Sequence, residues 1–188
     1  LNCDVGEGIG NEAALFPYIS SCNIACGGHA GDADSMLQTA ILAQKHDVKV
    51  GAHPSYPDRE HFGRVHMVLE KEVLQAHIEQ QIKALQEIIG PLDIPLHHIK
   101  AHGALYNDLA SGGRLALEYL EALEPFGKDI LVYIRDGYYS LDEPLFFRPE
   151  DSGSEASPTL VKGADGERVV LSGGKQITGW KKAGSVQG

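Results

Sequence analysis

A repeating unit organises residues 1–134: a short run of small or apolar residues ends at a polar residue, and a loop and a helical segment follow. Short apolar runs bounded by turn signals predict β-strands, and apolar residues at every third or fourth position predict helices. Strands that alternate with helices favour a parallel sheet with right-handed crossovers, so the expected fold class is α/β. The predicted strands cover residues 1–4, 21–27, 48–53, 96–103 and 129–134.

The segments between these strands carry the spacing of amphipathic helices. Asp32 or Asp34 can cap the first of them, and its expected buried stripe is Met36, Leu37, Ala40 and Ile41. A long helix over residues 70–89 ends at Gly90 and Pro91. Its expected stripe is Val73, Leu74, Ile78, Ile82, Leu85 and Ile89. A shorter helix is expected over residues 115–123.

Composition narrows the class of function. The formal net charge of −10 and the pI near 5.3 argue against a nucleic-acid surface and against an anionic membrane as partner. No apolar run approaches the roughly 18 residues of a spanning helix, and no signal peptide is visible. Cys3, Cys22 and Cys26 lie in apolar or small-residue stretches, which predicts buried structural thiols and a reducing, cytoplasmic compartment.

Polar residues stand where the predicted strands end. Because ligands bind at the carboxyl ends of parallel strands, we expect these side chains to converge on one site. Carboxylates, imidazoles and an amine at one place suit general acid–base chemistry or metal-assisted hydrolysis. The residues are Asp4, Glu7, His29, Asp32, His53, Asp58, Lys100 and His102.

Alternation within residues 96–103 separates the neighbouring polar groups. His98, Lys100 and His102 share one face of an extended strand, and we expect His98 to be a satisfied core histidine while the other two reach the site. Lys100 can stabilise a developing oxyanion, and Arg64 is a second candidate for contact with an anion. Asp32 is equally a helix cap or a site residue.

A metal site is an open alternative. Asp4 with two or three of His29, His53 and His102 would offer nitrogen and oxygen ligands suited to zinc or a similar divalent ion. No compact metal-binding motif is present, so the fold would have to assemble these ligands. The glycine-rich residues 6–10 could cradle an anion, which is a weak indication of nucleotide binding.

Four motifs in order resemble the LamB/YcsF family: LNCDVGEG, NIACGGHAGD, VGAHPSYPD followed by FGR, and HIKAHGALYN. The resemblance covers about residues 1–110 and implies a TIM-like, seven-stranded β/α barrel of the glycoside hydrolase/deacetylase type. It also implies the A component of an ATP-dependent 5-oxoprolinase, which opens 5-oxoproline to L-glutamate with ATP, Mg²⁺, water and partner subunits B and C. The family's later His-Gly-Asp motif does not occur in these 188 residues, so the barrel is also predicted to be incomplete at its C-terminal end.

With this resemblance, we expect residues 1–188 to form a single β/α-barrel domain, with well-matched βα units over 1–134 and a divergent tail over 135–188. Within the tail, residues 149–158 are expected to form a loop and residues 168–180 a β-hairpin. The expected catalytic residues are Asp4, Glu7, Lys100 and His102, among which Asp4, Glu7 and His102 are candidates for the general base. The expected substrate contacts are His29, His53, Arg64, Tyr106 and Asn107.

Two other functions stay open at this point. A metal-dependent deacetylase or amidohydrolase would use the same strand ends, with chelator-sensitive activity that does not need ATP. A non-catalytic binding subunit would bind a small anion or a partner and turn nothing over. Assembly into a homo-oligomer is compatible with each of these functions.

Overall fold

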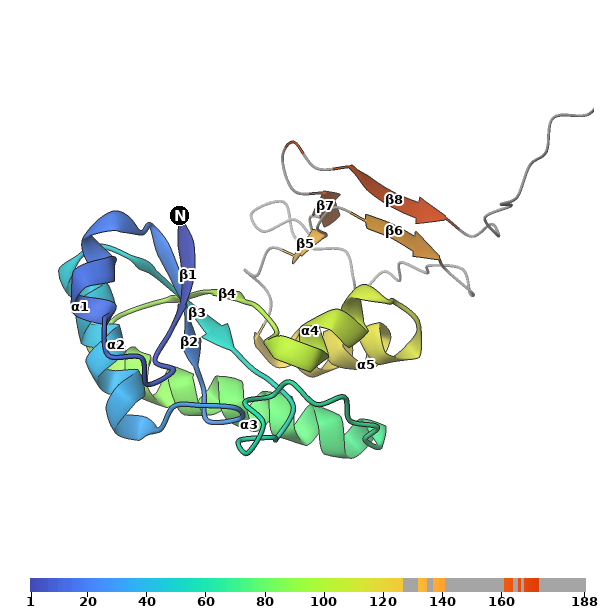
Figure 1. Ribbon diagram of the computed structural model, residues 1–188, viewed down its shortest axis with the longest axis horizontal. Coiled ribbons are helices and arrows are strands. Elements are labelled where there is room, and N and C mark those ends of the chain that lie inside the picture. Colours follow the sequence, from blue (N-terminus) through green and yellow to red (C-terminus); the bar gives the residue numbers. More distant parts are fainter. Residues whose placement is uncertain (127–131, 135–136, 141–160, 164–165, 167, 173–188) are drawn as a thin grey trace, which may run out of the picture.

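A computed structural model describes residues 1–126, 132–134, 137–140, 161–163, 166 and 168–172 (Figure 1). Its centre is a four-stranded sheet in the order β1-β2-β3-β4, and each neighbouring pair is parallel. The strands are β1 (Asn2–Val5), β2 (Ser21–Ala25), β3 (Lys49–His53) and β4 (Leu96–Ile99). The predicted α/β class with a parallel sheet is therefore confirmed.

Helices follow the strands as the sequence predicts. The elements are α1 (Glu12–Leu15), η1 (Phe16–Tyr18), α2 (Ala33–Lys45), α3 (Lys71–Ile89), η2 (Gly90–Leu92), α4 (Gly103–Ala110), α5 (Arg114–Leu123) and η3 (Glu124–Phe126). The helix α4 was not predicted, because residues 96–103 were assigned to one strand. β4 instead ends at Ile99, and His102 stands at the N-cap position of α4. None of the described helices is long and apolar enough to cross a membrane.

Two smaller sheets lie later in the chain. β5 (Val132–Ile134) pairs in parallel with β7 (Val161–Gly163), and β6 (Gly137–Ser140) pairs in parallel with β8 (Val169–Ser172). β8 matches the first strand of the predicted hairpin, whereas the predicted turn and second strand lie outside the described residues. Within the described part of the chain the main sheet has four strands and does not close on itself, so the seven-stranded barrel stays a prediction.

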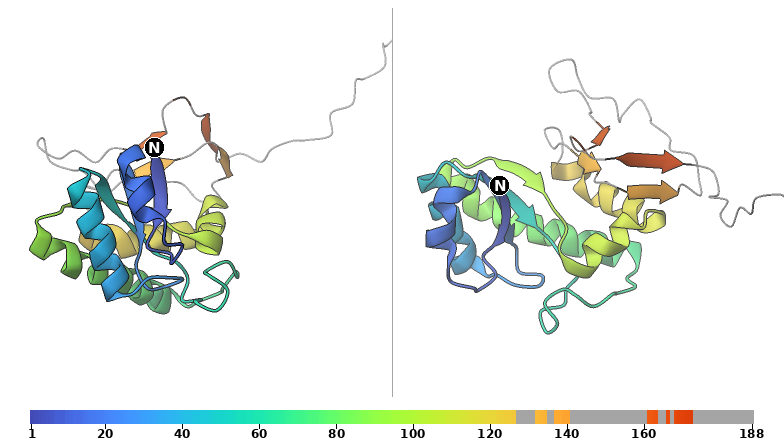
Figure 2. Two further views of the ribbon diagram at one scale, coloured as in Figure 1. Left: turned by 60° about the vertical axis from the view of Figure 1, so that its left-hand side comes forward. Right: turned by 45° about the horizontal axis from the view of Figure 1, so that its top comes forward.

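One face of the main sheet packs against helices α2 and α3 (Figures 1 and 2). Val5, Ile24 and Ala52 on this face are at most 2% exposed. From α3, the predicted stripe is buried at Leu74, Ile78, Ile82, Leu85 and Ile89. Because parallel strands are joined by helices, burial of this face is what the fold class requires.

Three residues assigned to the helix stripes are not buried. Leu37, Ile41 and Val73 are 40%, 47% and 45% exposed. The buried side of α2 instead consists of Met36, Thr39, Ala40 and Ala43. Each exposed residue follows or precedes a buried one directly in sequence, so its side chain lies at the margin of a stripe narrower than the apolar pattern suggests.

The predicted structural thiols are confirmed. Cys22 and Cys26 are buried, Cys3 is partly buried, and all three are free. Burial raises the pKa of both Cys22 and Cys26 to about 12, so their thiols stay protonated. The Cys26 thiol donates to the carbonyl of Ile24 at 2.9 Å and accepts the backbone N–H of His53 at 3.2 Å.

The opposite face of the same sheet is polar. Asp4, Asn23, Gly51 and His98 are successive partners across the four strands, so they form one row on this face. The glycine is required by its neighbour, because a Cβ at position 51 would lie 2.3 Å from Nε2 of His98. The strands end one or two residues beyond this row, and the candidate site lies at those carboxyl ends.

Candidate functional site

Four side chains meet at the carboxyl ends of the four strands. Glu7 follows β1, His29 follows β2, His53 ends β3 and His102 follows β4. One ligand atom from each lies within 4.8 Å of the others, and the three histidines are buried. We call these four residues the Glu–His cluster. The predicted convergence of polar groups from separate strands is thus present in the structure.

Ring stacking and a hydrogen bond hold His29 in the cluster. Its Nε2 is 3.0 Å from Oε1 of Glu7. Its ring is parallel to that of His102, with centroids 3.5 Å apart and an interplanar angle of 2°. The Phe62 ring meets both imidazoles edge-on. Nδ1 of His29 is buried and has no hydrogen-bond partner among the described residues.

Backbone carbonyls assign the tautomers of the other two histidines. Nδ1 of His53 lies 2.6 Å from the carbonyl oxygen of Lys100, and Nε2 of His102 lies 3.0 Å from that of Phe62. A carbonyl only accepts, so each of these nitrogens carries a proton, and the other nitrogen has a lone pair whenever its ring is neutral. Those two nitrogens, His53 Nε2 and His102 Nδ1, are 3.0 Å apart. Both face the Glu7 carboxylate.

Burial and neighbouring charge explain the protonation states. Burial, reinforced by the nearby His29 ring, lowers the pKa of His102 to about 4, so this ring is neutral at pH 7. Burial would raise the pKa of Glu7, but the hydrogen bond and charge of His29 outweigh it and hold that pKa below its usual value. The cluster therefore combines an ionised carboxylate with imidazole lone pairs.

Asp4 connects the cluster to the polar face of the sheet. Its Oδ2 lies 3.4 Å from Nε2 of His53, and Lys100 Nζ donates to both carboxylate oxygens at 2.7 and 3.0 Å. Burial would raise the pKa of Asp4, but the adjacent His53, Lys100 and Asn23 side chains outweigh it and hold that pKa well below its usual range. The Lys100–Asp4 pair is open to solvent, since the two side chains are 39% and 35% exposed.

Asn23 organises the polar groups beneath this pair. Its amide donates to Asp4 Oδ1 at 2.7 Å and to Asn2 Oδ1 at 2.6 Å, and its own carbonyl oxygen accepts from Nε2 of His98 at 2.6 Å. We call Asn2, Asp4, Asn23, His98 and Lys100 the polar layer. His98 is satisfied, as predicted, but it is half-buried in this layer and does not lie in the apolar core. Burial lowers its pKa to about 4.

Comparison with known proteins places this architecture in a family. The model of the LamB/YcsF family matches residues 1–141, which include the Glu–His cluster and the polar layer. The chain belongs to the LamB/YcsF family. Among solved structures it is similar to the lactam utilization protein from Thermus thermophilus, with a TM-score of 0.67 and 28% sequence identity over 91% of this chain and 85% of that chain.

Some of the predicted site residues lie outside the cluster of this LamB/YcsF chain. The guanidinium of Arg64 lies over the Phe62 ring, 5.3 Å from its centroid, and its side chain is exposed. Tyr106 and Asn107 are exposed residues of α4. Asp32 is the N-cap of α2 and forms a reciprocal capping box with Ser35, so the structure assigns it to the cap.

The long loop after β3 supports the site through both side chains and backbone, since its Phe62 carbonyl contacts His102. Asp58 bonds within the loop, with Oδ1 2.9 Å from Nδ1 of His61. Arg59 donates to the carbonyls of Gly27 and Gly31 at 3.1 and 2.7 Å and so ties this loop to the loop of His29. Sequence reasoning missed Arg59, Phe62 and Asn23. For Asn23 a signal existed, because it is a polar residue inside an apolar strand, but contacts made by backbone carbonyls leave no signal in side-chain types.

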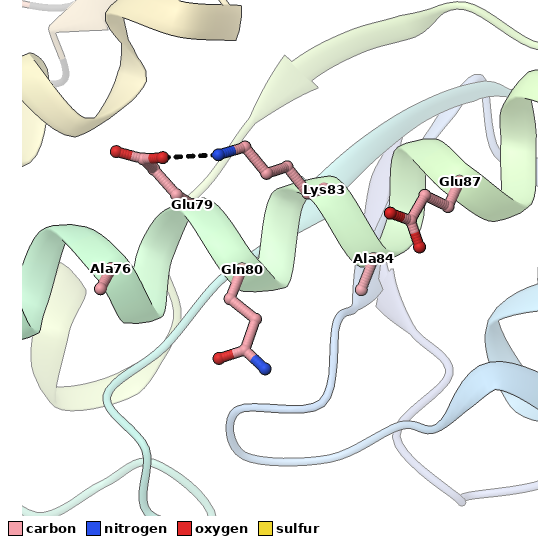
Figure 3. Close-up of a pocket in the computed structure, with 6 residues that line it drawn as sticks. All are labelled: Ala76, Glu79, Gln80, Lys83, Ala84 and Glu87. Atoms are coloured by element: carbon pink, nitrogen blue, oxygen red, sulfur yellow. Dashed lines mark hydrogen bonds and ion pairs between the residues drawn. The ribbon is translucent and has the colours of Figure 1, made fainter.

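A surface pocket of this LamB/YcsF chain lies on α3 (Figure 3). It is lined by residues of α3: Ala76, Glu79, Gln80, Lys83, Ala84 and Glu87. Lys83 and Glu79 form an ion pair of 2.7 Å there, one helical turn apart. Pairs of this kind are common on exposed helix surfaces. No residue of the Glu–His cluster lines this pocket, so it is separate from the candidate site.

Proposed function

We propose that this chain is the A component of an ATP-dependent 5-oxoprolinase and contributes the ring-opening site. The observation that supports this most directly is the Glu–His cluster beside the Lys100–Asp4 pair at the strand ends. Family membership and the similarity to a lactam utilization protein make a lactam the favoured substrate class. Among lactams, the resemblance of the sequence motifs favours 5-oxoproline.

Hydrolysis of a lactam places clear demands on a site. Water adds to the carbonyl carbon, the carbonyl oxygen gains negative charge, and the ring C–N bond then breaks as the nitrogen takes up a proton. The products are a free amine and a carboxylate, which for 5-oxoproline is glutamate. A second water is consumed in converting ATP to ADP and phosphate. The site must therefore supply a base, a group that stabilises the oxyanion and a proton for the leaving nitrogen.

The cluster contains groups suited to these roles. Glu7 is ionised and oriented by His29, so it can accept a proton from the attacking water. His102 presents a lone pair at Nδ1 beside Glu7, and it can hold that proton for transfer to the nitrogen. Lys100 points a charged ammonium at the open edge of the site, where it can stabilise the oxyanion.

Further contacts belong to the proposal. Arg64, whose side chain is exposed, is the candidate for a second contact with an anionic group of the substrate or of ATP. Tyr106 and Asn107 on α4 are candidates for contact with the remainder of the substrate. In this proposal ATP, as its Mg²⁺ complex, would transfer its terminal phosphoryl group to the lactam oxygen and release ADP, so Lys100 would then face the charged phosphoryl oxygens. Ring opening would leave an acyl phosphate, from which the second water would release phosphate, and subunits B and C would complete the enzyme.

The test is glutamate release from 5-oxoproline with ATP, using this chain with and without subunits B and C. We expect turnover in the complex only, and a loss of about 100-fold or more in Lys100→Ala and Glu7→Gln, as for a group that acts in the transition state. Lys83→Ala on α3 is the matched control and should retain wild-type turnover. A wild-type complex that releases no glutamate would refute the assignment.

The same cluster favours a second candidate, a metal-dependent amidohydrolase. Imidazoles and a carboxylate are ligand types found together at hydrolytic metal sites. Such an enzyme would hydrolyse a small amide or lactam without ATP and would lose activity to a chelator. Turnover that needs ATP and survives chelation favours the 5-oxoprolinase. Absence of turnover under both conditions, with ligand binding retained, favours a non-catalytic binding protein.

A further inference from the structure

We infer that the Glu–His cluster is a binding site for one divalent ion of the zinc class, with Nε2 of His53, Nδ1 of His102 and Oε1 of Glu7 as ligands. In this assignment His29 is a positioning residue that donates its Nε2 proton to Glu7. Asp4, which the sequence offered as a ligand, lies outside the set. The inference concerns binding by the chain alone. With an ion bound, Glu7 Oε1 and His102 Nδ1 would be its ligands, and they would act as base and proton carrier only in the metal-free site.

The separations between the three ligand atoms fit a single ion. Zinc takes nitrogen and oxygen ligands at about 2.0–2.2 Å, so two ligands in a tetrahedral site lie about 3.4 Å apart. The observed distances are 3.0 Å between the two nitrogens, 3.5 Å from His102 Nδ1 to Glu7 Oε1 and 3.9 Å from His53 Nε2 to Glu7 Oε1. These values bracket the distance that tetrahedral ligation requires.

With both imidazole rings neutral, no proton lies between His53 Nε2, His102 Nδ1 and Glu7 Oε1. In the neutral rings of His53 and His102 the proton lies on the nitrogen that faces a backbone carbonyl, so two lone pairs and a carboxylate oxygen face one another in that state. Groups that only accept repel each other at such distances unless a cation lies between them. A proton shared by the two imidazoles would remove the repulsion between those two nitrogens only, and the two contacts with Glu7 would remain. A metal ion serves all three.

The surroundings of the three ligands match those of metal sites. Ligating histidines almost always donate their second ring N–H to a carbonyl or carboxylate, and ligating carboxylates are themselves hydrogen-bonded. Lys100 and Phe62 provide the two carbonyls, and His29 provides the hydrogen bond to Glu7 at 3.0 Å. Three protein ligands are also the number used by catalytic zinc sites, which keep a position for water or substrate.

The ligand types decide between classes of ion. Mg²⁺ and Ca²⁺ prefer oxygen ligands, whereas imidazole suits zinc and its neighbours in the first transition row. Cys26 is the nearest thiol to consider, but its Sγ contacts the backbone of Ile24 and His53 on the apolar side. The site should therefore bind Zn²⁺ or Co²⁺ through nitrogen and oxygen, without thiolate.

Calorimetric titration of the chelator-stripped chain with Zn²⁺ tests the inference. We expect one ion per chain, and no comparable binding of Mg²⁺ or Ca²⁺. Co²⁺ should give the visible bands of a four-coordinate ion without the near-ultraviolet band of thiolate ligation. Less than one ion per chain, a thiolate band, or equal affinity for Mg²⁺ would overturn the assignment.

Variants assign the ligands individually. Glu7→Gln and His102→Gln should weaken Zn²⁺ binding by more than about 100-fold, whereas His29→Gln should weaken it by about 10–100-fold, the usual effect of an outer contact. His98→Gln, which removes a histidine from the same sheet, should bind within about threefold of wild type. Equal affinities in wild type and in Glu7→Gln would refute the ligand set.

Folding of each variant is checked separately by circular dichroism and thermal unfolding in chelator. If a variant does not fold, the Co²⁺ spectrum of the wild-type chain decides, because it reports ligand type without any substitution. The outcome is also separable from the proposed reaction. A chain that binds Zn²⁺ and releases no glutamate would sink the 5-oxoprolinase proposal alone, and a chain that turns over 5-oxoproline after complete removal of metal would sink a catalytic role for the ion.

Discussion

Two adjacent rows of residues cross the four-stranded sheet and have opposite characters. Val5, Ile24 and Ala52 lie in one row, at most 2% exposed, against α2 and α3. Asp4 and Asn23 lie one position earlier on their strands and belong to the polar layer. A step of one residue thus exchanges a packed core for a hydrogen-bonded network, because successive side chains of a strand point to opposite faces.

The contrast separates stability from chemistry. The apolar row stabilises the fold through the apolar area that it removes from water. The free energy lost when one of its residues is shortened therefore depends on the volume removed. The polar layer contributes little net stability, because each hydrogen bond formed within it replaces a hydrogen bond to water in the unfolded chain. Its role is to place Asp4 and Lys100 at the strand ends, where the Glu–His cluster lies. The predictions below test this division, in order of decreasing effect on the free energy of unfolding.

The largest loss is expected in the apolar row. Ile24→Ala removes buried methyl groups at a position that is 0% exposed and should lower the free energy of unfolding by about 2–5 kcal/mol. Ile41→Ala on α2, where the side chain is 47% exposed, is the control and should cost much less. Urea unfolding measures both. Equal losses would mean that the two isoleucines do not differ in burial.

A smaller loss is expected where the polar layer is packed most tightly. Gly51→Ala places a Cβ 2.3 Å from Nε2 of His98, so the ring must move and the variant should lose about 1–3 kcal/mol in urea unfolding. Gly90→Ala meets no atom within 4 Å and should stay within about 0.5 kcal/mol of wild type. If both variants matched wild type, the sheet would not be packed against His98 as described.

The pH dependence of stability sharpens the comparison further. The pKa of His98 is lowered to about 4 in the folded chain, whereas an unfolded histidine has its ordinary value near 6.5. Between these values the unfolded state binds more protons, so stability is full above pH 6.5 and decreases as pH falls toward 4. His98→Gln should make this decrease shallower, and the pKa of His102, also about 4, should account for part of the remainder. Identical profiles would contradict the assignment.

The smallest effect on stability is expected at the exposed pair. Lys100→Gln removes one charge of a salt bridge whose two side chains are 39% and 35% exposed, and exposed pairs contribute about 0–1 kcal/mol. In the 5-oxoprolinase assay the same variant should lose about 100-fold or more, because the ammonium proposed to stabilise the oxyanion is absent. A large loss of stability without loss of turnover would contradict the assignment of stability to the apolar row and of catalysis to the polar layer.

The sequence predicted the parallel sheet, its first four strands and most residues that meet at their ends. Periodicity and strand-end polarity are local signals, and the chemistry of Asp4, Glu7, His29, His53 and His102 follows from them. What could not be predicted depends on distances between segments far apart in the chain. Glu7 Oε1 lies 3.0, 3.9 and 3.5 Å from nitrogens of His29, His53 and His102, whereas Asp4 contacts His53 alone among the three, at 3.4 Å.

Other misses have equally specific causes. The residues 96–103 alternate as a strand does, yet the chain leaves the sheet after Ile99 and Gly103 adopts a positive φ of 57° at the start of α4. Arg64 stays a candidate contact for an anion, and its guanidinium lies over the ring of Phe62, a contact that the sequence did not indicate. Residue type alone does not distinguish these outcomes.

The carbonyls of Lys100 and Phe62 carry an evolutionary consequence. They determine which nitrogen of His53 and of His102 faces Glu7, and they belong to the main chain. A point mutation can replace any side-chain partner, but it cannot delete a peptide carbonyl. The orientation of the two rings is therefore inherited with the path of the backbone, so a substitution of Lys100 removes its ammonium but leaves the carbonyl that orients His53.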